Sequence, residues 1–193
     1  MAGKLSTKEK LANAAKKVFA RKGYHIATMN DISRAAGIAK GTIYLYIRHK
    51  EDLITLIAEQ EVDSLLAHLR EIQKSVSSPS ERLRKILHFL VERVREYERT
   101  GLAVMMRDLY GVKAKVRADV YKHKQKLLDF FAEIFTEGIQ KGEFRPIDVT
   151  MPSYILFAFV GSLVHQEMRL SIDDVEAFVE TFLDIYLYGV KKR

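Results

Sequence analysis

A short segment close to the N-terminus combines side chains that can contact nucleic acid. Lys40 can donate a hydrogen bond to guanine O6 or N7 or to a phosphate, and Thr42 can bond a base edge or touch a thymine methyl group. Gly41, between them, allows a close approach of the backbone. The residues that we expect to contact DNA are Thr28, Lys40, Gly41, Thr42, Tyr44, Leu45, Tyr46 and Lys50.

Two short helices must position this segment. Thr28 and Asp31 have the spacing of a helix cap, so a first helix should run from Thr28 to Ala36, and Gly37 should end it. A second short helix should begin near Lys40. Two helices joined by a tight turn form a helix-turn-helix, and the first residues of its second helix enter the major groove. The residues that should hold the pair together are Ile32, Ala36, Ile38 and Ile43.

The charge of the chain is concentrated in the same region. Residues 1–50 carry 11 basic and two acidic side chains, a net charge of +9, whereas residues 51–193 have a net charge of −2. An excess of this kind favours an N-terminal part that binds a polyanion. Thr28 and Lys50 stand at expected helix N-termini, where free N–H groups favour a phosphate.

Each of these residues also has a purely structural interpretation. Tyr44 and Tyr46 could pack in a small core, and Lys40 and Lys50 could be solvated surface charges. Thr28 caps its helix whether or not DNA is bound. The combination of these residues with the basic segment is what favours DNA binding.

The composition excludes several classes of protein. The 193 residues include no Cys, which excludes a disulfide scaffold and thiolate chemistry and fits a reducing compartment such as the cytoplasm. Only 3 Pro and 10 Gly favour long helices over a turn-rich β fold, so we predict an all-α protein. The most apolar stretch, residues 151–164, is too short to span a membrane, and we expect no membrane association.

The C-terminal part should be a bundle of helices that follow a loop at residues 75–80. We expect helices over about 81–99, 102–110, 113–141, 150–169 and 172–189. The last two have more apolar surface than one monomer core needs, which favours a homodimer interface. The expected interface residues are Tyr154, Phe157, Gly161, Val164, Phe178, Phe182 and Ile185. The alternative is that both helices are central in the monomer.

Aromatic and Met side chains in the same part could line an apolar cavity for a small effector. Met is soft enough to suit an adaptable pocket, and Arg107 could pair with an acidic head group. The candidate ligand-binding residues are Phe89, Tyr97, Met105, Met106, Arg107, Tyr110, His123, Leu127, Phe131 and Phe157. Such residues are also ordinary core material, and Arg107 could extend to solvent at the surface.

Nothing in the sequence favours catalysis. Lys40-Gly41-Thr42 lacks the upstream glycines of a phosphate-binding loop, and the six His residues are scattered without metal-ligand spacing. We therefore predict no enzyme, no metal site and no cofactor.

Four blocks of the N-terminal region carry a resemblance: Gly23-Tyr24, residues 27–32, residues 36–46 and residues 50–53. In this order and spacing they resemble the tetracycline-repressor (TetR) family of bacterial regulators. The resemblance implies an all-helical protein of nine or so helices, a dimer and a ligand-controlled repressor. It departs at Ser33, where Ala is usual, at Ala39, where Ser often contacts phosphate, and at Ile47, where Phe usually packs.

Two segments resemble one branch of that family more narrowly. Residues 41–46 with residues 50–52, and residues 136–143, are similar to the fatty-acid-degradation regulators, which implies a long-chain acyl-CoA inducer. The residues that would then meet its nucleotide phosphates are Lys113, Lys115, Arg117, Lys122, Lys124 and Lys126.

The sequence thus predicts a DNA-binding domain over residues 1–50 and a ligand-binding and dimerisation domain over residues 51–193. The expected partners are double-stranded operator DNA with a palindromic site, a small apolar effector that releases the protein from DNA, and a second copy of the chain. The alternatives are a helical small-molecule-binding module or enzyme with a vestigial helix-turn-helix, and a DNA-coating protein without sequence preference.

Overall fold

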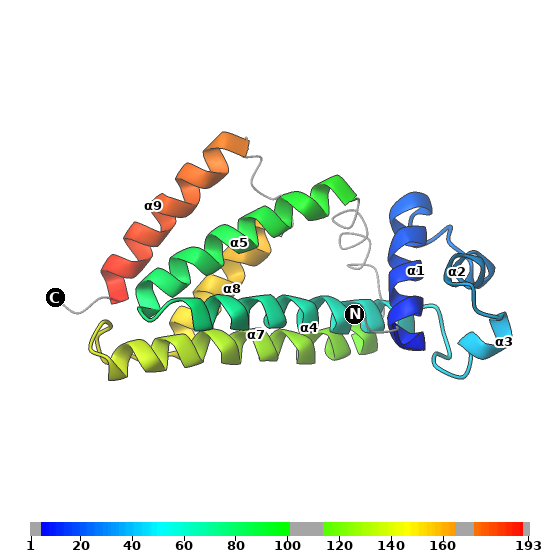
Figure 1. Ribbon diagram of the computed structural model, residues 1–193, viewed down its shortest axis with the longest axis horizontal. Coiled ribbons are helices and arrows are strands. Elements are labelled where there is room, and N and C mark those ends of the chain that lie inside the picture. The colour runs from blue at the N-terminus through cyan, green and yellow to red at the C-terminus, as the bar shows by residue number, and fades with distance from the viewer. Residues whose placement is uncertain (1–4, 101–113, 165–171, 191–193) are drawn as a thin grey trace. The chain divides into compact units, whose positions relative to one another are not determined.

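The computed structural model describes residues 5–100, 114–164 and 172–190. Within these ranges the chain forms eight helices and no strand (Figure 1), which confirms the predicted all-helical class. The longest are α4 (Asp52–Ser75) and α7 (Ala114–Gln140), which contain no Pro. The short helix expected over residues 102–110 lies outside the described residues. In the described part of the chain, no helix has the length and apolarity that a membrane span requires.

The chain divides into two compact units. The first comprises Met1–Ser64 and Glu98–Lys124, and the second comprises Leu65–Tyr97 and Gln125–Arg193. Each unit has its own buried hydrophobic core. Leu53, Ile54 and Ile57 lie in the first core, so the N-terminal half of α4 belongs structurally to the first unit. The predicted functional division after residue 50 stays a prediction.

The first unit begins with α1 (Thr7–Lys22), α2 (Met29–Ala36) and the short α3 (Lys40–Ile43) (Figure 1). The predicted cap of the second helix is confirmed: the Thr28 hydroxyl accepts from the Asp31 amide, and the Asp31 carboxylate accepts from the Thr28 amide. Gly37 ends α2 in the left-handed conformation, at φ 65°. Local sequence signals therefore determine both ends of α2.

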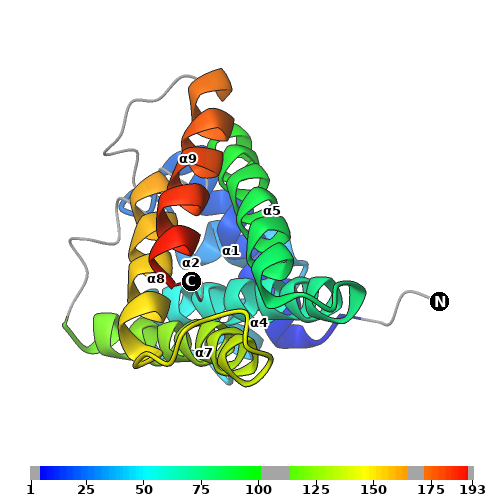
Figure 2. The same cartoon turned by 90° about the vertical axis from the view of Figure 1, so that its left-hand side faces the viewer.

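The second unit contains α5 (Pro79–Thr100), α8 (Thr150–Val164) and α9 (Ile172–Val190), with the later parts of α4 and α7. Figure 2 shows α8 and α9 side by side. The Tyr186 hydroxyl donates to the Pro152 carbonyl at 2.6 Å, and the Phe182 and Phe159 rings stack at 3.7 Å between centroids. These contacts join the two helices.

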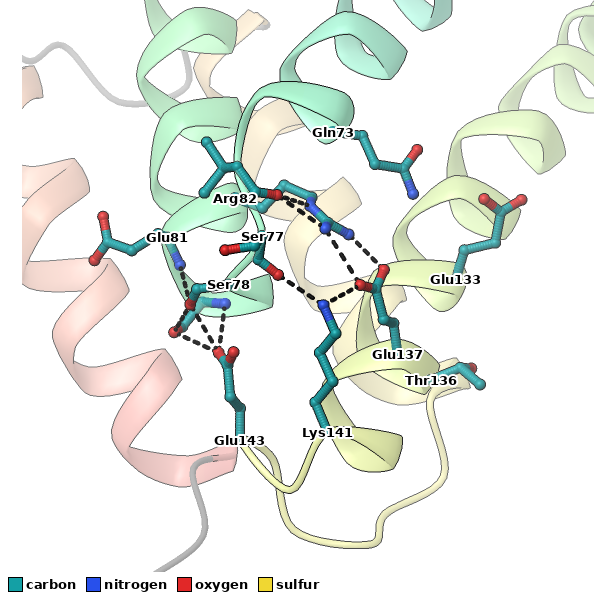
Figure 3. A network of polar contacts seen from close by, with 12 residues as sticks. Gln73, Ser77, Ser78, Glu81, Arg82, Glu133, Thr136, Glu137, Lys141 and Glu143 are labelled. Carbon is teal, nitrogen blue, oxygen red and sulfur yellow. Dashed lines mark hydrogen bonds and ion pairs between the residues drawn. The ribbon is translucent and has the colours of Figure 1, made fainter.

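A buried guanidinium ties the loop before α5 to the end of α7 (Figure 3). Arg82, only 4% exposed, donates to both carboxylate oxygens of Glu137, at 2.6 and 3.3 Å, and to the Val76 carbonyl at 3.0 and 3.2 Å. Lys141 lies 2.8 Å from Glu137 and donates to the Ser77 carbonyl at 2.9 Å. Hydrogen bonds from Arg82, and then from Lys141, lower the pKa of Glu137 to about 2.

The turn that follows α7 is fixed by a second carboxylate and by one ring. Glu143 accepts from the Ser78 hydroxyl at 2.9 Å and from the amide and hydroxyl of Ser80 at 3.1 and 2.8 Å. The buried Phe144 ring lies so close to Gly138 that a Cβ there would be 2.1 Å from its Cδ2 atom. Structural contacts therefore account for the residue types at Glu137, Gly138, Lys141, Glu143 and Phe144.

Candidate nucleic-acid interface

The helix-turn-helix is held together by a small apolar contact and one side-chain hydrogen bond. Ile32 and Ile43 are fully buried, and Ala36 and Ile38 pack against them, as predicted. The Ser33 hydroxyl donates to the Ile38 carbonyl at 2.7 Å across the turn. Ser33, one of the departures from the family pattern, therefore stabilises the connection between α2 and α3.

The second helix of the helix-turn-helix, α3, is a single turn. Regular helix ends at Ile43, and Tyr44–Tyr46 continue as a turn in which Leu45 and Tyr46 donate to the carbonyls three residues earlier. Ala39 at the N-cap has no side-chain acceptor for the first amides of α3.

The predicted DNA-reading residues are exposed at one end of this unit. Lys40, Gly41 and Thr42 are exposed, and Leu45 has 81% of its surface accessible. Tyr44 and Tyr46 are 46% and 44% exposed. The flanking residues Ile43 and Ile47 are buried, at 0% and 5%. Tyr44 and Tyr46 therefore project outward from the first core, in which Ile43 and Ile47 are buried.

Thr28 is a structural cap in a charged environment. Its hydroxyl donates to the Asp31 carboxylate at 2.8 Å, and Lys22 donates to the same carboxyl group at 2.7 Å. Hydrogen bonds from Lys22 and from Thr28 hold the pKa of Asp31 well below its ordinary value. Lys22 offsets the negative charge that would otherwise oppose a phosphate at the start of α2.

Lys50 contacts its own unit. Its ammonium donates to the carbonyls of Tyr24, Ala27 and His25 at 2.7, 3.1 and 3.3 Å and lies 4.5 Å from the centroid of the Tyr24 ring. Burial, with a smaller effect of Glu51, raises the pKa of the Tyr24 hydroxyl to about 12. The role of Lys50 toward DNA stays a prediction.

One exposed side chain in this unit was not expected from the sequence. Ile26, in the loop between α1 and α2, has 75% of its surface accessible. A single Ile between His25 and Ala27 has no periodicity to reveal its exposure. Its place beside the three carbonyls that Lys50 contacts becomes visible only in the folded chain.

The predicted effector residues fall partly within the described structure. Phe131 is 2% exposed in the core of the second unit, and Leu127 packs against that core. Phe89 also packs there, and its ring stacks on His68 at 5.7 Å between centroids, while Phe157 in α8 is half-buried. The predicted residues that lie outside the described residues or have undescribed side chains are Tyr97, Met105, Met106, Arg107, Tyr110 and His123.

The predicted dimer residues divide into an exposed and a buried group. Tyr154 on α8 and Ile185 on α9 are 39% and 72% exposed, whereas Phe182 packs against the core. The side chains of Gly161, Val164 and Phe178 are not described. The exposed apolar residues on these two helices are Met151, Tyr154, Ile155, Ile185 and Tyr188, which we call the α8–α9 face.

Among the described residues, no group of three or more His, Asp or Glu side chains is placed to hold a metal ion.

An N-terminal helix-turn-helix attached to a second helical unit defines a class of DNA-binding regulators. The chain matches the family model for bacterial regulatory proteins of the tetR family over residues 11–57 and the tetracyclin repressor-like C-terminal domain over residues 76–165. It is 32% identical over 143 residues to the uncharacterized HTH-type transcriptional regulator YfiR of Bacillus subtilis, covering 71% of this chain and 67% of that protein. The chain belongs to the TetR family, which confirms the resemblance seen in its sequence.

Two further comparisons cover almost the whole chain. It is 25% identical over 187 residues to the fatty acid metabolism regulator protein of Bacillus subtilis, 95% of each chain. The crystal structure of the regulator FadR from Bacillus subtilis in complex with stearoyl-CoA superposes with a TM-score of 0.75 at 24% identity, covering 93% of this chain and 97% of that one. This structural likeness establishes the fold.

Proposed function

We propose that this protein is a transcriptional repressor that binds a palindromic operator as a dimer and leaves it when a long-chain acyl-CoA binds. The observation that carries the proposal is the exposed turn at Tyr44–Tyr46, beside Lys40 and Thr42, on a helix-turn-helix of the TetR family. As a regulator of bacterial DNA it acts in the cytoplasm. The residues proposed to contact DNA are Thr28, Lys40, Gly41, Thr42, Tyr44, Leu45, Tyr46 and Lys50.

The test of DNA recognition is selection of duplexes from a random library, with excess nonspecific competitor, followed by footprinting on the selected site. We expect a palindromic sequence with half-sites about one helical turn apart. Thr42→Ala should change which bases are preferred, whereas Tyr44→Ala should weaken binding to all sequences. Failure to enrich any sequence at low ionic strength would contradict the proposal.

The dimer is proposed to form through the α8–α9 face. Several large exposed apolar side chains on two helices that contact each other are typical of a surface that a partner covers. Ile185→Glu should give monomers in sedimentation velocity and should weaken operator binding. Leu45→Glu is the matched control, because it also replaces an exposed aliphatic side chain by a carboxylate. It should abolish operator binding and leave the dimer intact.

The proposal that the effector is a long-chain acyl-CoA rests on two similar proteins. A fatty acid metabolism regulator and a stearoyl-CoA complex are both among the proteins to which this chain is similar. The operator complex should be titrated with stearoyl-CoA, stearate and coenzyme A separately. We expect only stearoyl-CoA to release DNA, by a coupling of roughly 1–3 kcal/mol, or about 5–150-fold in affinity. Equal release by stearate would exclude a role for the nucleotide.

A further inference from the structure

Arg48 follows the exposed turn that we propose to contact DNA. Ile47, directly before it, is 5% exposed and lies in the first core, whereas Arg48 itself is exposed. The amides of Tyr46 and Ile47 donate to the Ile43 carbonyl at 2.9 and 3.1 Å, so a hydrogen-bonded turn leads up to Arg48. The backbone of Arg48 is therefore held on its N-terminal side by a buried neighbour.

A carboxylate holds the other side of Arg48. One oxygen of Asp52, Oδ2, accepts from the Arg48 amide at 2.7 Å and from the His49 amide at 2.9 Å. Asp52 is the first residue of α4, so these two bonds attach the end of the turn to the start of that helix. The backbone of Arg48 is thus fixed on both sides, although the residue lies between two helices.

These bonds leave the side chain of Arg48 without an internal partner. The nearby Asp52 carboxylate bonds the Arg48 backbone, and the guanidinium forms no hydrogen bond or ion pair with any of the described residues. By contrast, Lys22 in the same unit is paired with Asp31 at 2.7 Å. A guanidinium has five N–H donors and keeps its charge in a protein, so Arg48 can donate to an anion outside the chain.

The surroundings of Arg48 indicate which anion fits. It stands two residues after Tyr46 and two before Lys50, which are both proposed to contact DNA, and residues 1–50 have a net charge of +9. A phosphate of the DNA backbone accepts two parallel N–H bonds from an arginine fork. Phosphate contacts of this kind fix the register of a protein on the duplex without reading its sequence.

We propose that Arg48 binds a phosphate of the operator backbone and that Asp52 is the positioning residue that presents it. This inference rests on the proposed function, because it requires that the first unit binds DNA. Lys17 provides the matched control. It is an exposed cation on α1, and its ammonium likewise forms no hydrogen bond or ion pair with the described residues.

The first experiment compares Arg48→Met with Lys17→Met in the full-length protein. Affinity for the selected operator, and for a random duplex, is measured over a series of salt concentrations. Loss of one phosphate contact reduces the slope of log affinity against log salt by about 0.9. We expect that reduction on both duplexes for Arg48→Met and the wild-type slope for Lys17→Met. A wild-type slope in Arg48→Met, or an equal reduction in both variants, would overturn the proposal.

The phosphate itself can be located on the DNA. Uncharged methylphosphonate linkages replace the operator phosphates one at a time, and each duplex is titrated with wild type and with Arg48→Met. One linkage in each half-site should weaken wild-type binding and have no effect on the variant. If every linkage weakened both proteins equally, Arg48 would not be a phosphate ligand. Should Arg48→Met not fold, Arg48→Lys replaces it and should bind more weakly with the wild-type salt slope.

The role of Asp52 is tested by the sign of its effect. Removing a carboxylate near DNA should by itself strengthen binding, because it removes a repulsion of the phosphates. If Asp52 positions Arg48, Asp52→Ala should instead weaken binding, and Asp52→Asn, which keeps an acceptor oxygen, should restore most of it. In the Arg48→Met background, Asp52→Ala should no longer weaken binding. Stronger binding by the single variant Asp52→Ala would refute the positioning role.

The wild-type protein provides two further readouts. Should Asp52→Ala not fold, hydrogen exchange of the wild-type Arg48 and His49 amides tests their bonds to Asp52: protected amides support the positioning role, and freely exchanging amides overturn it. If no operator is selected, the proposed function fails, while the slope on the random duplex still decides whether Arg48 binds a phosphate. Wild-type protein that binds neither duplex at low salt would contradict both proposals.

Discussion

The Tyr44–Tyr46 turn and the Arg82–Glu137 network represent opposite uses of polar and aromatic side chains. In the network the guanidinium and the carboxylate bond each other, and neighbouring carbonyls and Lys141 complete their shells. In the turn, the two tyrosines are half-exposed, and the described residues offer their hydroxyls no hydrogen bond. Side chains satisfied internally stabilise the fold, whereas side chains held outward without partners are available to a ligand.

Lys50 shows why the comparison has to be made on the folded chain. Its residue type and its place before α4 are those of a phosphate-binding lysine, as the sequence suggests. Its hydrogen bonds are those of a network residue. Four predictions test the distinction between these two groups, beginning with the largest expected effect.

Glu137→Gln should have the largest effect on stability. It leaves the buried Arg82 guanidinium without its carboxylate, which should cost about 3 kcal/mol of unfolding free energy. Glu133→Gln is the control, because Glu133 pairs with Arg70 where both side chains are nearly half-exposed, and about 0.5 kcal/mol is expected. Urea denaturation at pH 7 measures both. Equal losses would show that burial does not distinguish the two pairs.

The same pair should determine part of the acid sensitivity. The pKa of Glu137 is about 2 in the folded protein and 4.5 ordinarily, so its contribution is complete above pH 4.5 and is lost as the pH falls toward 2. The stability difference between wild type and Glu137→Gln should therefore be constant above about pH 5 and shrink below it. Urea midpoints across this range provide the measurement. A difference that stays constant through the acid range would refute the assignment.

A single added methyl group should lower the stability of the protein in Gly138→Ala but not in Gly41→Ala. At Gly138 the new Cβ meets the buried Phe144 ring, and a loss of about 1–3 kcal/mol is expected. At Gly41 nothing lies within 4 Å, so thermal stability should be unchanged or slightly raised. Operator affinity should show the reverse order, with Gly41→Ala the weaker binder. An equal loss of stability in both variants would contradict the proposed difference between the two regions.

Leu45→Ala should have the smallest effect on operator affinity, and the effect should be confined to the recognition of thymine methyl groups. An exposed aliphatic side chain next to Thr42 is suited to contact thymine methyl groups in the major groove. Replacing thymine by uracil in the selected operator should weaken wild-type binding by about 1 kcal/mol, and Leu45→Ala should be insensitive to that replacement. Ile26→Ala, the matched exposed aliphatic, should retain the sensitivity. A Leu45→Ala variant that still discriminates would assign the methyl contact elsewhere.

Local signals in the sequence predict most of the fold. The Thr28–Asp31 cap and Gly37 determine the ends of α2 because each acts within one turn of helix. The early end of α3 at Ile43 escapes prediction, since the following residues are also compatible with a helix.

Nonlocal contacts account for the remainder of the site. Lys50 and Ala27 are separated by 23 residues, and Arg82 and Glu137 by 55, so no periodicity connects them. The burial of Ile43, which the sequence predicts, leaves the neighbouring Leu45 and Tyr46 exposed, and the packed unit adds the exposed fraction of each side chain. Residue types therefore indicate what a side chain can bond, and the fold decides which partner it has.

The α8–α9 face has a consequence for gene control. In the proposed dimer, Ile185 and Tyr188, which are 72% and 74% exposed in the single chain, would be shielded from water. Below the dimerisation constant, the amount of operator-competent protein falls with the square of the copy number. In a cell that makes too little of this chain, repression would therefore weaken more steeply than the copy number falls, before any inducer is present.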